Sequence, residues 1–276
     1  MIELNVGEVI IMIKNIKLFV NHNDQSIRLA KLVKDNFIKN GFNVSDDSFD
    51  LGIAVGGDGA FIRMVRNSGF DSSVNYVGVN AGTLGFLQEA NEHEINRLIS
   101  VVQNEEYKLD EMYIQETDVN YDNKEKKIYS LNEIIVRDKD LKTVKFDVLV
   151  DNDLLEIFTG DGVLISSTIG STGHNLSYGG SIVYSNLPTL QITPLAPINS
   201  KAYTNLVTSI ILPKDKEIMI MPTDFTKNLM FTIDGEHQTF ENVDLVNTYV
   251  KDKKIKCLRF KDSNFSRKVN EKLLSK

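Results

Sequence analysis

The sequence predicts an α/β N-terminal domain of Rossmann-like type followed by an all-β sandwich domain. Strand and helix patterns alternate over the first 105 or so residues, whereas short β-branched and aromatic runs separated by turn residues follow from about residue 107. The length of 276 residues also exceeds the usual size of one domain. We therefore expect an α/β domain at 1–106, a β-sandwich at 107–260 and a terminal helix at 261–276 that packs on the first domain.

The first domain is expected to begin with a strand at residues 16–20 and a helix over 24–40. Gly41 follows this helix, where a glycine commonly ends one. The apolar residues of the helix recur at i, i+3, i+4 and i+8, which predicts one buried stripe. This stripe comprises Leu29, Leu32, Val33 and Phe37.

Buried strands are predicted at 51–55 and 74–79, and a further helix at 92–103. Strands that alternate with helices in this way form a parallel sheet. Ligands of such sheets bind at the carboxyl ends of the strands. The apolar positions of the last helix again share one face, and they are Ile95, Leu98, Ile99 and Val102.

The second domain is predicted from its short apolar runs and the turns between them. Strands are expected at 127–136, 143–150, 154–158, 207–212, 229–233 and 244–250. Turns are expected at 121–124, 151–153, 213–215, 233–236 and 251–254. Residues 264–275 form the predicted terminal helix, whose apolar stripe is Phe265, Val269 and Leu273.

Composition excludes several classes of protein. The formal net charge of −7 argues against a nucleic-acid surface spread over the molecule. Cys257 is the only cysteine, so no disulfide forms within the chain and no cysteine metal site is expected. No apolar run approaches the ~20 residues that cross a bilayer. We expect a cytoplasmic protein that binds neither membrane nor nucleic acid.

The most informative stretch is the glycine turn Gly56-Gly-Asp-Gly59, which follows the strand predicted at 51–55. A glycine turn between a strand and a helix directs free N–H groups at an anion. Such a turn suits a nucleotide phosphate, and the carboxylate of Asp58 could orient a hydroxyl or a metal. The alternative is a tight turn in which Asp58 caps the helix.

Four further stretches interrupt the regular patterns. Asn132-Glu133 offers an amide and a carboxylate that complement the hydroxyls of a ribose, or alternatively forms an ordinary turn. Residues 160–174 are dense in glycine, serine and threonine, which leaves room for an adenine or phosphate; Ser171 or Thr172 could cap a short helix. The stretch 80–87 suggests close backbone approach and a flat hydrophobic contact, or alternatively a packing loop, and the proline-broken loop 193–200 could line an adenine slot with Ala196.

The histidines do not form pairs with the spacing of a metal site, so no protein metal site is expected. Only His174 lies within one of the unusual motifs. His93 is expected at an exposed helix start.

Taken together, these motifs resemble those of the ATP-NAD kinase family in its compact bacterial form. The glycine turn alone is also similar to that of phosphofructokinases and lipid kinases. Asn132-Glu133 and the motif Gly170-Ser-Thr172 make the resemblance specific, and it covers nearly the whole chain. It implies an α/β domain and a β-sandwich with NAD between them, and transfer of the ATP γ-phosphoryl group, or in some members that of polyphosphate, to the 2′-hydroxyl of the NAD adenosine ribose.

The resemblance also assigns roles to residues. Asp58 would be the essential acid, Asn132 and Glu133 would hold NAD through a ribose, and Phe86 would pack near the nicotinamide. Gly57, Gly59, Arg63 and Asn80 would complete the nucleotide-binding set. The adenosine would be held by Asp161, Thr172, Gly173, His174, Asn175, Leu176, Ser177 and Ala196. Mg²⁺ or another divalent cation would accompany ATP, and the chain would form a homodimer or homotetramer.

The chain departs from the family pattern around the expected adenosine pocket. Gly173-His174 replaces Ala-Tyr, Thr168 replaces a proline, Thr159 replaces a basic residue and Ala60 replaces a threonine. These departures predict an active kinase with weak affinity for NAD. Two alternatives remain open, namely a lipid or sugar kinase that shares the glycine turn and a non-catalytic dinucleotide sensor.

Overall fold

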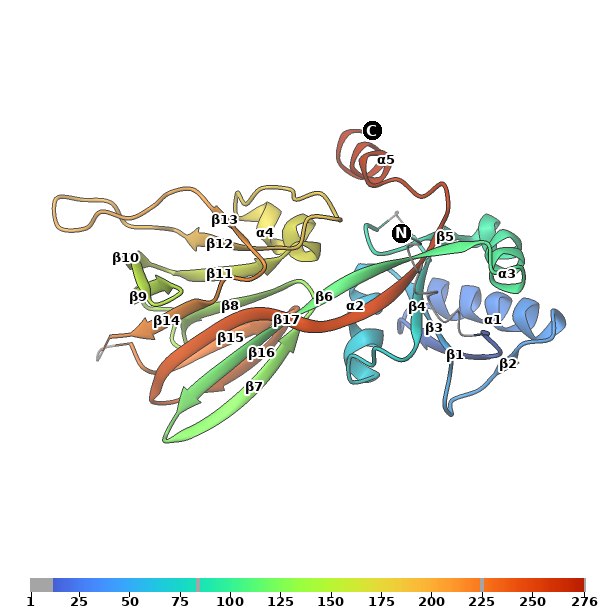
Figure 1. Cartoon of the computed structure of the whole chain (residues 1–276), viewed down its shortest axis with the longest axis horizontal. Helices are drawn as coiled ribbons and strands as arrows, with labels where there is room; N and C mark the ends of the chain where they lie inside the picture. The colour runs from blue at the N-terminus through green and yellow to red at the C-terminus, as the bar shows by residue number, and fades with distance from the viewer. Residues whose placement is uncertain (1–11, 83–84, 224–225, 276) are drawn as a thin grey trace, which may run out of the picture. The chain divides into compact units, whose positions relative to one another are not determined.

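The computed structural model describes residues 12–275 except 83, 84, 224 and 225 (Figure 1). Contacts within the chain divide it into two compact units. The first contains residues up to Glu111 together with Ile255 onward, and the second contains Met112–Lys254. Residues 255–260, which we expected in the second domain, therefore belong to the first unit.

The first unit is built on a parallel sheet in the order β17-β4-β3-β1-β2, with β5 also paired to β4. Helices α1 and α3 pack on each other on one face of this sheet, and α2 lies on the other (Figure 1). The strands are β1 (Asn15–Val20), β2 (Asn43–Val44), β3 (Leu51–Gly56), β4 (Asn75–Asn80), β5 (Ala90–Asn91) and the end of β17 (Val243–Phe260). The helices are α1 (Asp24–Lys39), α2 (Asp58–Asn67), the 3₁₀ turn η1 (Glu92–Glu94) and α3 (Ile95–Gln103).

Local sequence signals set the ends of α1. The side chain of Asn23 accepts a hydrogen bond from the backbone N–H of Ser26 at 2.8 Å, and Gly41 follows the helix at φ +87°. The predicted buried stripe is confirmed for three of its four residues, but Leu32 is 40% exposed. Ala30 is buried instead, because the face that packs on the sheet is rotated slightly from the pattern of the larger apolar residues.

The second unit is a β-sandwich, as predicted. One sheet is antiparallel in the order β13-β12-β11-β8-β15-β16, and the other contains β10-β9-β14-β17 with β6 and β7. Its buried core contains Phe146 and Ile220 from the sheet with β9 and β14. Val136, Ile165 and Phe231 of the antiparallel sheet pack in the same core.

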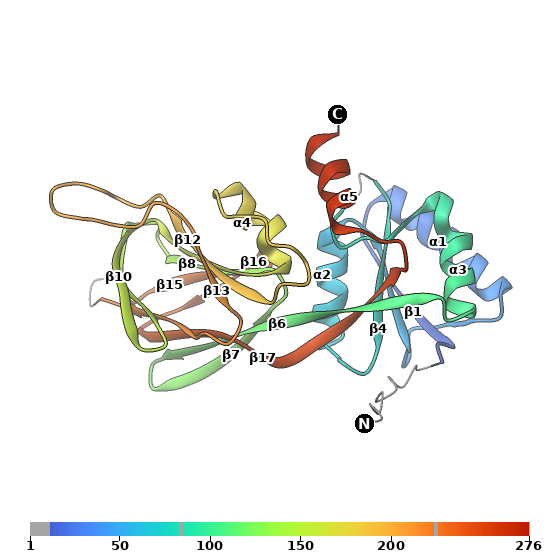
Figure 2. The same ribbon diagram turned by 45° about the horizontal axis from the view of Figure 1, so that its top comes forward.

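The strand bounds of this unit locate its motifs. They are β6 (Tyr107–Tyr121), β7 (Lys124–Ser130), β8 (Glu133–Asp138), β9 (Val144–Val150), β10 (Asp153–Gly160), β11 (Gly162–Ser167), β12 (Thr189–Leu195), β13 (Ile210–Pro213), β14 (Ile218–Pro222), β15 (Leu229–Ile233) and β16 (Glu236–Phe240). A 3₁₀ turn, η2 (Ile169–Thr172), and the single-turn helix α4 (His174–Ser177) follow β11 (Figure 2).

One predicted strand and one predicted turn were wrong, and one predicted loop was wrong in part. The run 127–136 is broken, because β7 ends at Ser130 and β8 begins at Glu133 in the other sheet. Residues 251–254 form no turn but lie within β17, whose charged side chains at Lys251 and Asp252 are exposed. Residues 193–195 belong to β12, where Pro194 is tolerated because β13 pairs only with Thr189–Ile192.

Two helix predictions also need correction. Ser171 and Thr172 cap no helix, since the N-cap of α4 is Gly173 and makes no side-chain bond. The terminal helix forms as α5 (Phe265–Val269) and continues as the π-helical turn η3 (Asn270–Leu274), but Leu273 is 40% exposed. Among the helices that the structure describes, none has the length and apolarity needed to cross a membrane.

Candidate active site

The glycine turn links β3 to α2 and places Asp58 at the first position of the helix. Gly56 has φ +151°, and a Cβ there would lie 2.8 Å from the Cβ of Ala60, so the turn requires glycine. Gly57 is the N-cap, without a side-chain hydrogen bond. The alternative in which the Asp58 carboxylate caps the helix is therefore wrong.

The Asp58 carboxylate is instead held by the segment after β4. The backbone N–H of Phe86 donates to Oδ2 at 2.9 Å, and that of Leu87 donates to Oδ1 at 3.0 Å. Lys272 Nζ donates to Oδ2 at 3.1 Å. A Cβ at Gly85 would lie 2.0 Å from Oδ1, so the glycine allows the carboxylate to approach. These contacts orient an acid whose side chain is 25% exposed.

The other predicted residues of the first unit lie around this turn or in the same loop. Arg63 Nη2 donates to Asn21 Oδ1 at 2.8 Å, and its guanidinium is exposed. The amide of Asn80 is engaged with Gly82, donating to its carbonyl at 2.5 Å. Phe86 is buried, and its ring lies 6.2 Å from that of Phe265.

In the second unit, Asn132 and Glu133 stand where the chain passes from β7 to β8. The carboxylate of Asp234 holds this segment by accepting from the backbone N–H groups of Leu131 at 2.8 Å, Asn132 at 2.7 Å and Glu133 at 3.2 Å. Burial raises the pKa of Asp234 to about 6. Asp234 thus fixes the backbone from which both predicted ribose-binding side chains extend.

His174 lies beside this pair, with Nδ1 at 3.1 Å from Glu133 Oε1. Its hydrogen bond to Glu133 raises the pKa of His174 above its ordinary value. A Cβ at Gly173 would lie 3.1 Å from Glu133 Oε2, so the absent side chain leaves space there. Asn132 Oδ1 and Glu133 Oε2 are buried acceptors without a hydrogen-bond partner among the described residues.

Four further residues of the predicted adenosine set lie in or next to α4. Asn175 is fully buried, and its Oδ1 accepts from the Thr193 hydroxyl at 2.6 Å, so its amide is engaged within the fold. Thr172 lies in η2 and donates to the Ile169 carbonyl at 3.3 Å. Leu176 and Ser177 complete α4.

Asp161 and Ala196 lie apart from these residues. Asp161 directly precedes β11, and its backbone N–H donates to the Leu195 carbonyl at 2.9 Å. Glu133 pairs with Ser166 at the other end. Four residue steps of a strand span roughly 13 Å. The structure thus separates Asp161 and Ala196 from the Glu133–His174 pair.

The departure at Thr159 has a structural explanation. Its side chain is buried, and its backbone N–H donates to Asn205 Oδ1 at 2.8 Å. A basic residue in this place would have to bring its charge out of a buried position.

The sequence motifs do not include two residues that support the site, Asp234 and Lys272. Asp234 was interpreted only as part of a hairpin turn, and that turn does form between β15 and β16. Lys272 was placed on the terminal helix without a role. No local pattern marks either one, because each acts on residues far away in the sequence.

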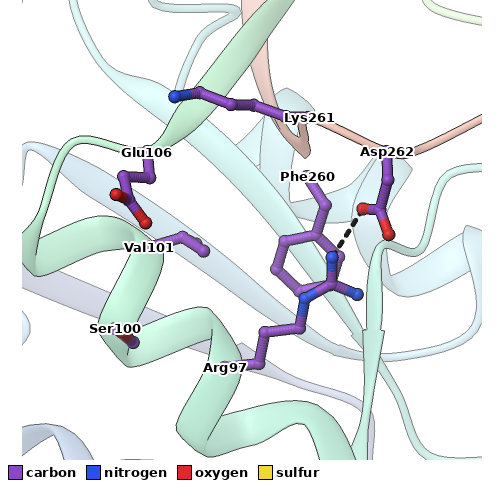
Figure 3. A pocket seen from close by; sticks show the side chains of 7 residues that line it. All are labelled: Arg97, Ser100, Val101, Glu106, Phe260, Lys261 and Asp262. Atoms are coloured by element: carbon purple, nitrogen blue, oxygen red, sulfur yellow. Dashed lines mark hydrogen bonds and ion pairs between the residues drawn. The ribbon is translucent and has the colours of Figure 1, made fainter.

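An open depression of about 550 Å³ lies elsewhere on the first unit (Figure 3). Two of its charged lining residues form an ion pair, since Arg97 Nη2 lies 2.5 Å from Asp262 Oδ1, and the Arg97 guanidinium lies 4.0 Å from the centre of the Phe260 ring. The depression contains none of the predicted site residues.

The comparisons with known proteins agree with these motifs. Residues 11–107 match the model of the ATP-NAD kinase N-terminal domain, and residues 131–260 match that of the ATP-NAD kinase C-terminal domain. An NAD kinase from Finegoldia magna is 36% identical over 269 residues, which are 95% of this chain and 98% of that protein. The chain belongs to the ATP-NAD kinase family.

Other proteins are similar over nearly the same share of this chain, at lower sequence identity. NAD kinase 2 of Bacillus subtilis is 29% identical over 91% of this chain and 93% of its own. The crystal structure of yeast NADH kinase complexed with NADH superposes with a TM-score of 0.83 at 20% identity, covering 95% of this chain and 90% of that one. An Archaeoglobus fulgidus NAD kinase in complex with ATP gives 0.71 at 18% identity, covering 94% and 98%. The predicted fold class is confirmed.

Proposed function

We propose that this chain transfers the γ-phosphoryl group of ATP to the 2′-hydroxyl of the adenosine ribose of NAD, which yields NADP. Membership of the ATP-NAD kinase family supports the reaction, and relatives similar over almost their whole length are NAD kinases. Neither a lipid or sugar kinase nor a non-catalytic sensor is favoured by these comparisons.

One observation carries the proposal most directly. Asn132 Oδ1 and Glu133 Oε2 are buried acceptors that no described residue satisfies. A buried polar atom without a partner is costly and needs a reason. The hydroxyls of a ribose are donors that would satisfy both acceptors. We therefore assign the recognition of an NAD ribose to this pair.

Asp58 is the residue to which we assign the chemistry. Phosphoryl transfer depends mainly on alignment and on neutralisation of charge, because its transition state is loose. A carboxylate is a weak base toward an alcohol hydroxyl before the bond to phosphorus begins to form. Asp58 would therefore orient the 2′-hydroxyl and accept its proton late, while Phe86 and Leu87 hold the carboxylate in place.

The side chains around Asp58 suit a divalent cation only if that cation is bound together with ATP. The described residues contain no group of three or more His, Cys, Asp and Glu side chains that could hold a metal. Mg²⁺ commonly binds through one or two carboxylates and the substrate phosphates, and Asp58 is the carboxylate at the glycine turn. When bound, Mg²⁺ would supply positive charge against the phosphates.

Replacing His174 by tyrosine is expected to lower the KM for NAD. A phenol ring covers more of a base than an imidazole ring does. Steady-state kinetics of the variant would check this. The replacement of exposed His93 by tyrosine is a matched control that should leave the KM unchanged. An unchanged or raised KM in His174→Tyr would contradict the assignment.

The same histidine predicts a pH effect of defined sign. The pKa of His174 is raised in the folded chain, so the stabilisation that its ion pair with Glu133 provides is complete below the ordinary pKa near 6.5. It is lost as the pH rises through the higher folded-state pKa. Thermal unfolding as a function of pH should therefore show a decline there that is absent from His174→Tyr.

The separation of Asp161 and Ala196 from Glu133 bears on the oligomeric state. An adenosine is shorter than the distance between the two ends of β11. We therefore propose that a homodimer or homotetramer supplies the two groups from different copies of the chain. Sedimentation at working concentration would test this, because a strict monomer with full activity contradicts it.

The function is tested by incubating the purified protein with ATP, Mg²⁺ and NAD, and by measuring NADP. Parallel reactions with a lipid and with a sugar phosphate would distinguish the alternative kinases. We expect NADP alone to form. Binding of NAD in calorimetry without any NADP would instead indicate a sensor, and phosphorylation of the lipid or sugar would refute the proposed substrate.

A further inference from the structure

We propose that Lys272 is a positioning residue for phosphoryl transfer, which acts by holding the carboxylate of Asp58. The inference rests on the proposed function, because it takes Asp58 as the reacting acid. It assigns a role to the terminal segment of the chain, which the predicted site residues do not include. All the residues concerned belong to the first unit.

The contacts of Lys272 join the two parts of the Asp58 environment. Its Nζ lies 3.1 Å from Asp58 Oδ2 and 4.5 Å from the centre of the Phe86 ring. The backbone N–H of Phe86 donates to the same Oδ2. An ammonium over an aromatic face is stabilised by the charge distribution of the ring. Lys272 thus completes a cluster of a carboxylate, an amide and a cation.

The helix that carries Lys272 is anchored at Lys268, one helical turn earlier. Lys268 Nζ lies 2.9 Å from Glu89 Oε2 and 2.7 Å from the Gln88 carbonyl. Arg259 also pairs with Glu89, at 3.1 Å. Glu89 and Arg259 are both buried, and removing one partner of a buried ion pair is strongly destabilising. Since residues i and i+4 share a helix face, this anchor directs Lys272 toward Asp58.

Burial of apolar side chains does not explain why α5 and η3 lie beside Asp58. Leu273 is 40% exposed and Leu274 is 70% exposed, and α5 and η3 contain no fully buried residue. The segment contacts the rest of the first unit mainly through Phe265, Lys268 and Lys272. Two of these three are cations that meet carboxylates, so charge rather than core packing determines which face is turned inward.

The ammonium of Lys272 has a role in the proposed phosphoryl transfer. In the proposed reaction the 2′-oxygen forms a bond to the γ-phosphorus as the bond from phosphorus to the ADP oxygen breaks, and ADP leaves with the electron pair. The hydroxyl proton passes to Asp58, which loses its charge. The ammonium of Lys272 holds the carboxylate in position before the transfer and remains as a nearby positive charge afterwards. Misplacement of a reacting group by about 1 Å can cost ~10²-fold in rate.

The test compares Lys272→Met and Lys272→Arg with Arg267→Met, a control that removes an exposed cation from the same helix. Because the pair is partly exposed, we expect Lys272→Met to lower kcat about tenfold, with less than about a threefold change in either KM. Lys272→Arg should recover part of the lost kcat, and Arg267→Met should leave kcat unchanged. The melting temperatures of all three should stay close to that of the parent chain.

A double variant tests whether Lys272 acts through Asp58. In an Asp58→Asn background, Lys272→Met should cause little further loss, because the carboxylate it holds is absent. An equal loss in both backgrounds would refute the inference, as would an unchanged kcat in Lys272→Met alone. A raised kcat would also refute it, because the ammonium would then obstruct Asp58. Failure of the parent chain to form NADP would instead refute the proposed function.

Discussion

Replacing Asp58 by asparagine is expected to lower kcat for NADP formation by at least ~10²-fold, the scale of loss when a general base is removed. Asparagine keeps the shape of the side chain but cannot accept the proton of the 2′-hydroxyl. The affinity for NAD should change far less, because the predicted ribose contacts of Asn132 and Glu133 remain. Steady-state kinetics and calorimetry with NAD measure the two effects separately.

The matched control for this variant is Asp24→Asn. Asp24 and Asp58 each occupy the first turn of a helix, so both substitutions remove one favourable charge from a helix N-terminus. Any loss that comes from helix stability should appear in both variants. Near-normal turnover in Asp58→Asn would show that another group takes the proton, and the role assigned to Asp58 would be wrong.

Replacing Asp234 by alanine is expected to damage both stability and NAD binding. The carboxylate accepts three backbone N–H bonds from residues 131–133, and the variant leaves these donors without it. Loss of such bonds costs about 1–3 kcal/mol for each buried group left unsatisfied, less where the segment relaxes. We expect unfolding to require about 2–4 kcal/mol less free energy and the KM for NAD to rise at least tenfold.

A control separates this effect from backbone strain. Asp122 stands at another hairpin turn of the same unit and has φ +48°, as Asp234 does. Asp122→Ala should therefore share the cost of an alanine at positive φ without the effect on KM. If Asp234→Ala binds NAD normally, Asp234 does not organise the ribose-binding pair.

The same residue contributes a pH dependence whose sign follows from its burial. The pKa of Asp234 is raised from 3.8 to about 6 in the folded chain. The stability it contributes is therefore complete below pH ~4 and declines as the pH rises through about 6. The free energy of unfolding in urea should decline over this pH range in the parent chain, and this decline should be absent from Asp234→Asn.

Much of the fold could be predicted because its signals are local. The helix at 24–39 carries its own cap in Asn23 and its own stop in Gly41, and the glycine turn follows directly from a buried strand. The hairpin turns at 122–123 and 151–152 contain Asp and Asn residues at positive φ, as their sequence indicated. Leu32 was misplaced, because periodicity does not determine exactly which residues of a face meet the sheet.

The supporting contacts of the site could not be predicted in this way. Asp234 acts on Asn132 across 102 residues, and Lys272 reaches Asp58 across 214. Such contacts depend on how strands and helices assemble rather than on spacing within a motif. The break between β7 and β8 was missed for the same reason, since Asp234 holds the turn that an apolar run concealed.

The central claim is that Asp58 orients the hydroxyl that is phosphorylated, and a crystal structure of the complex with NAD tests it most directly. We predict an oxygen of Asp58 within about 2.6–3.2 Å of the 2′-oxygen of the adenosine ribose, the reach of a catalytic hydrogen bond. A complex with NAD fully bound and the Asp58 carboxylate in contact with no sugar oxygen would contradict the account.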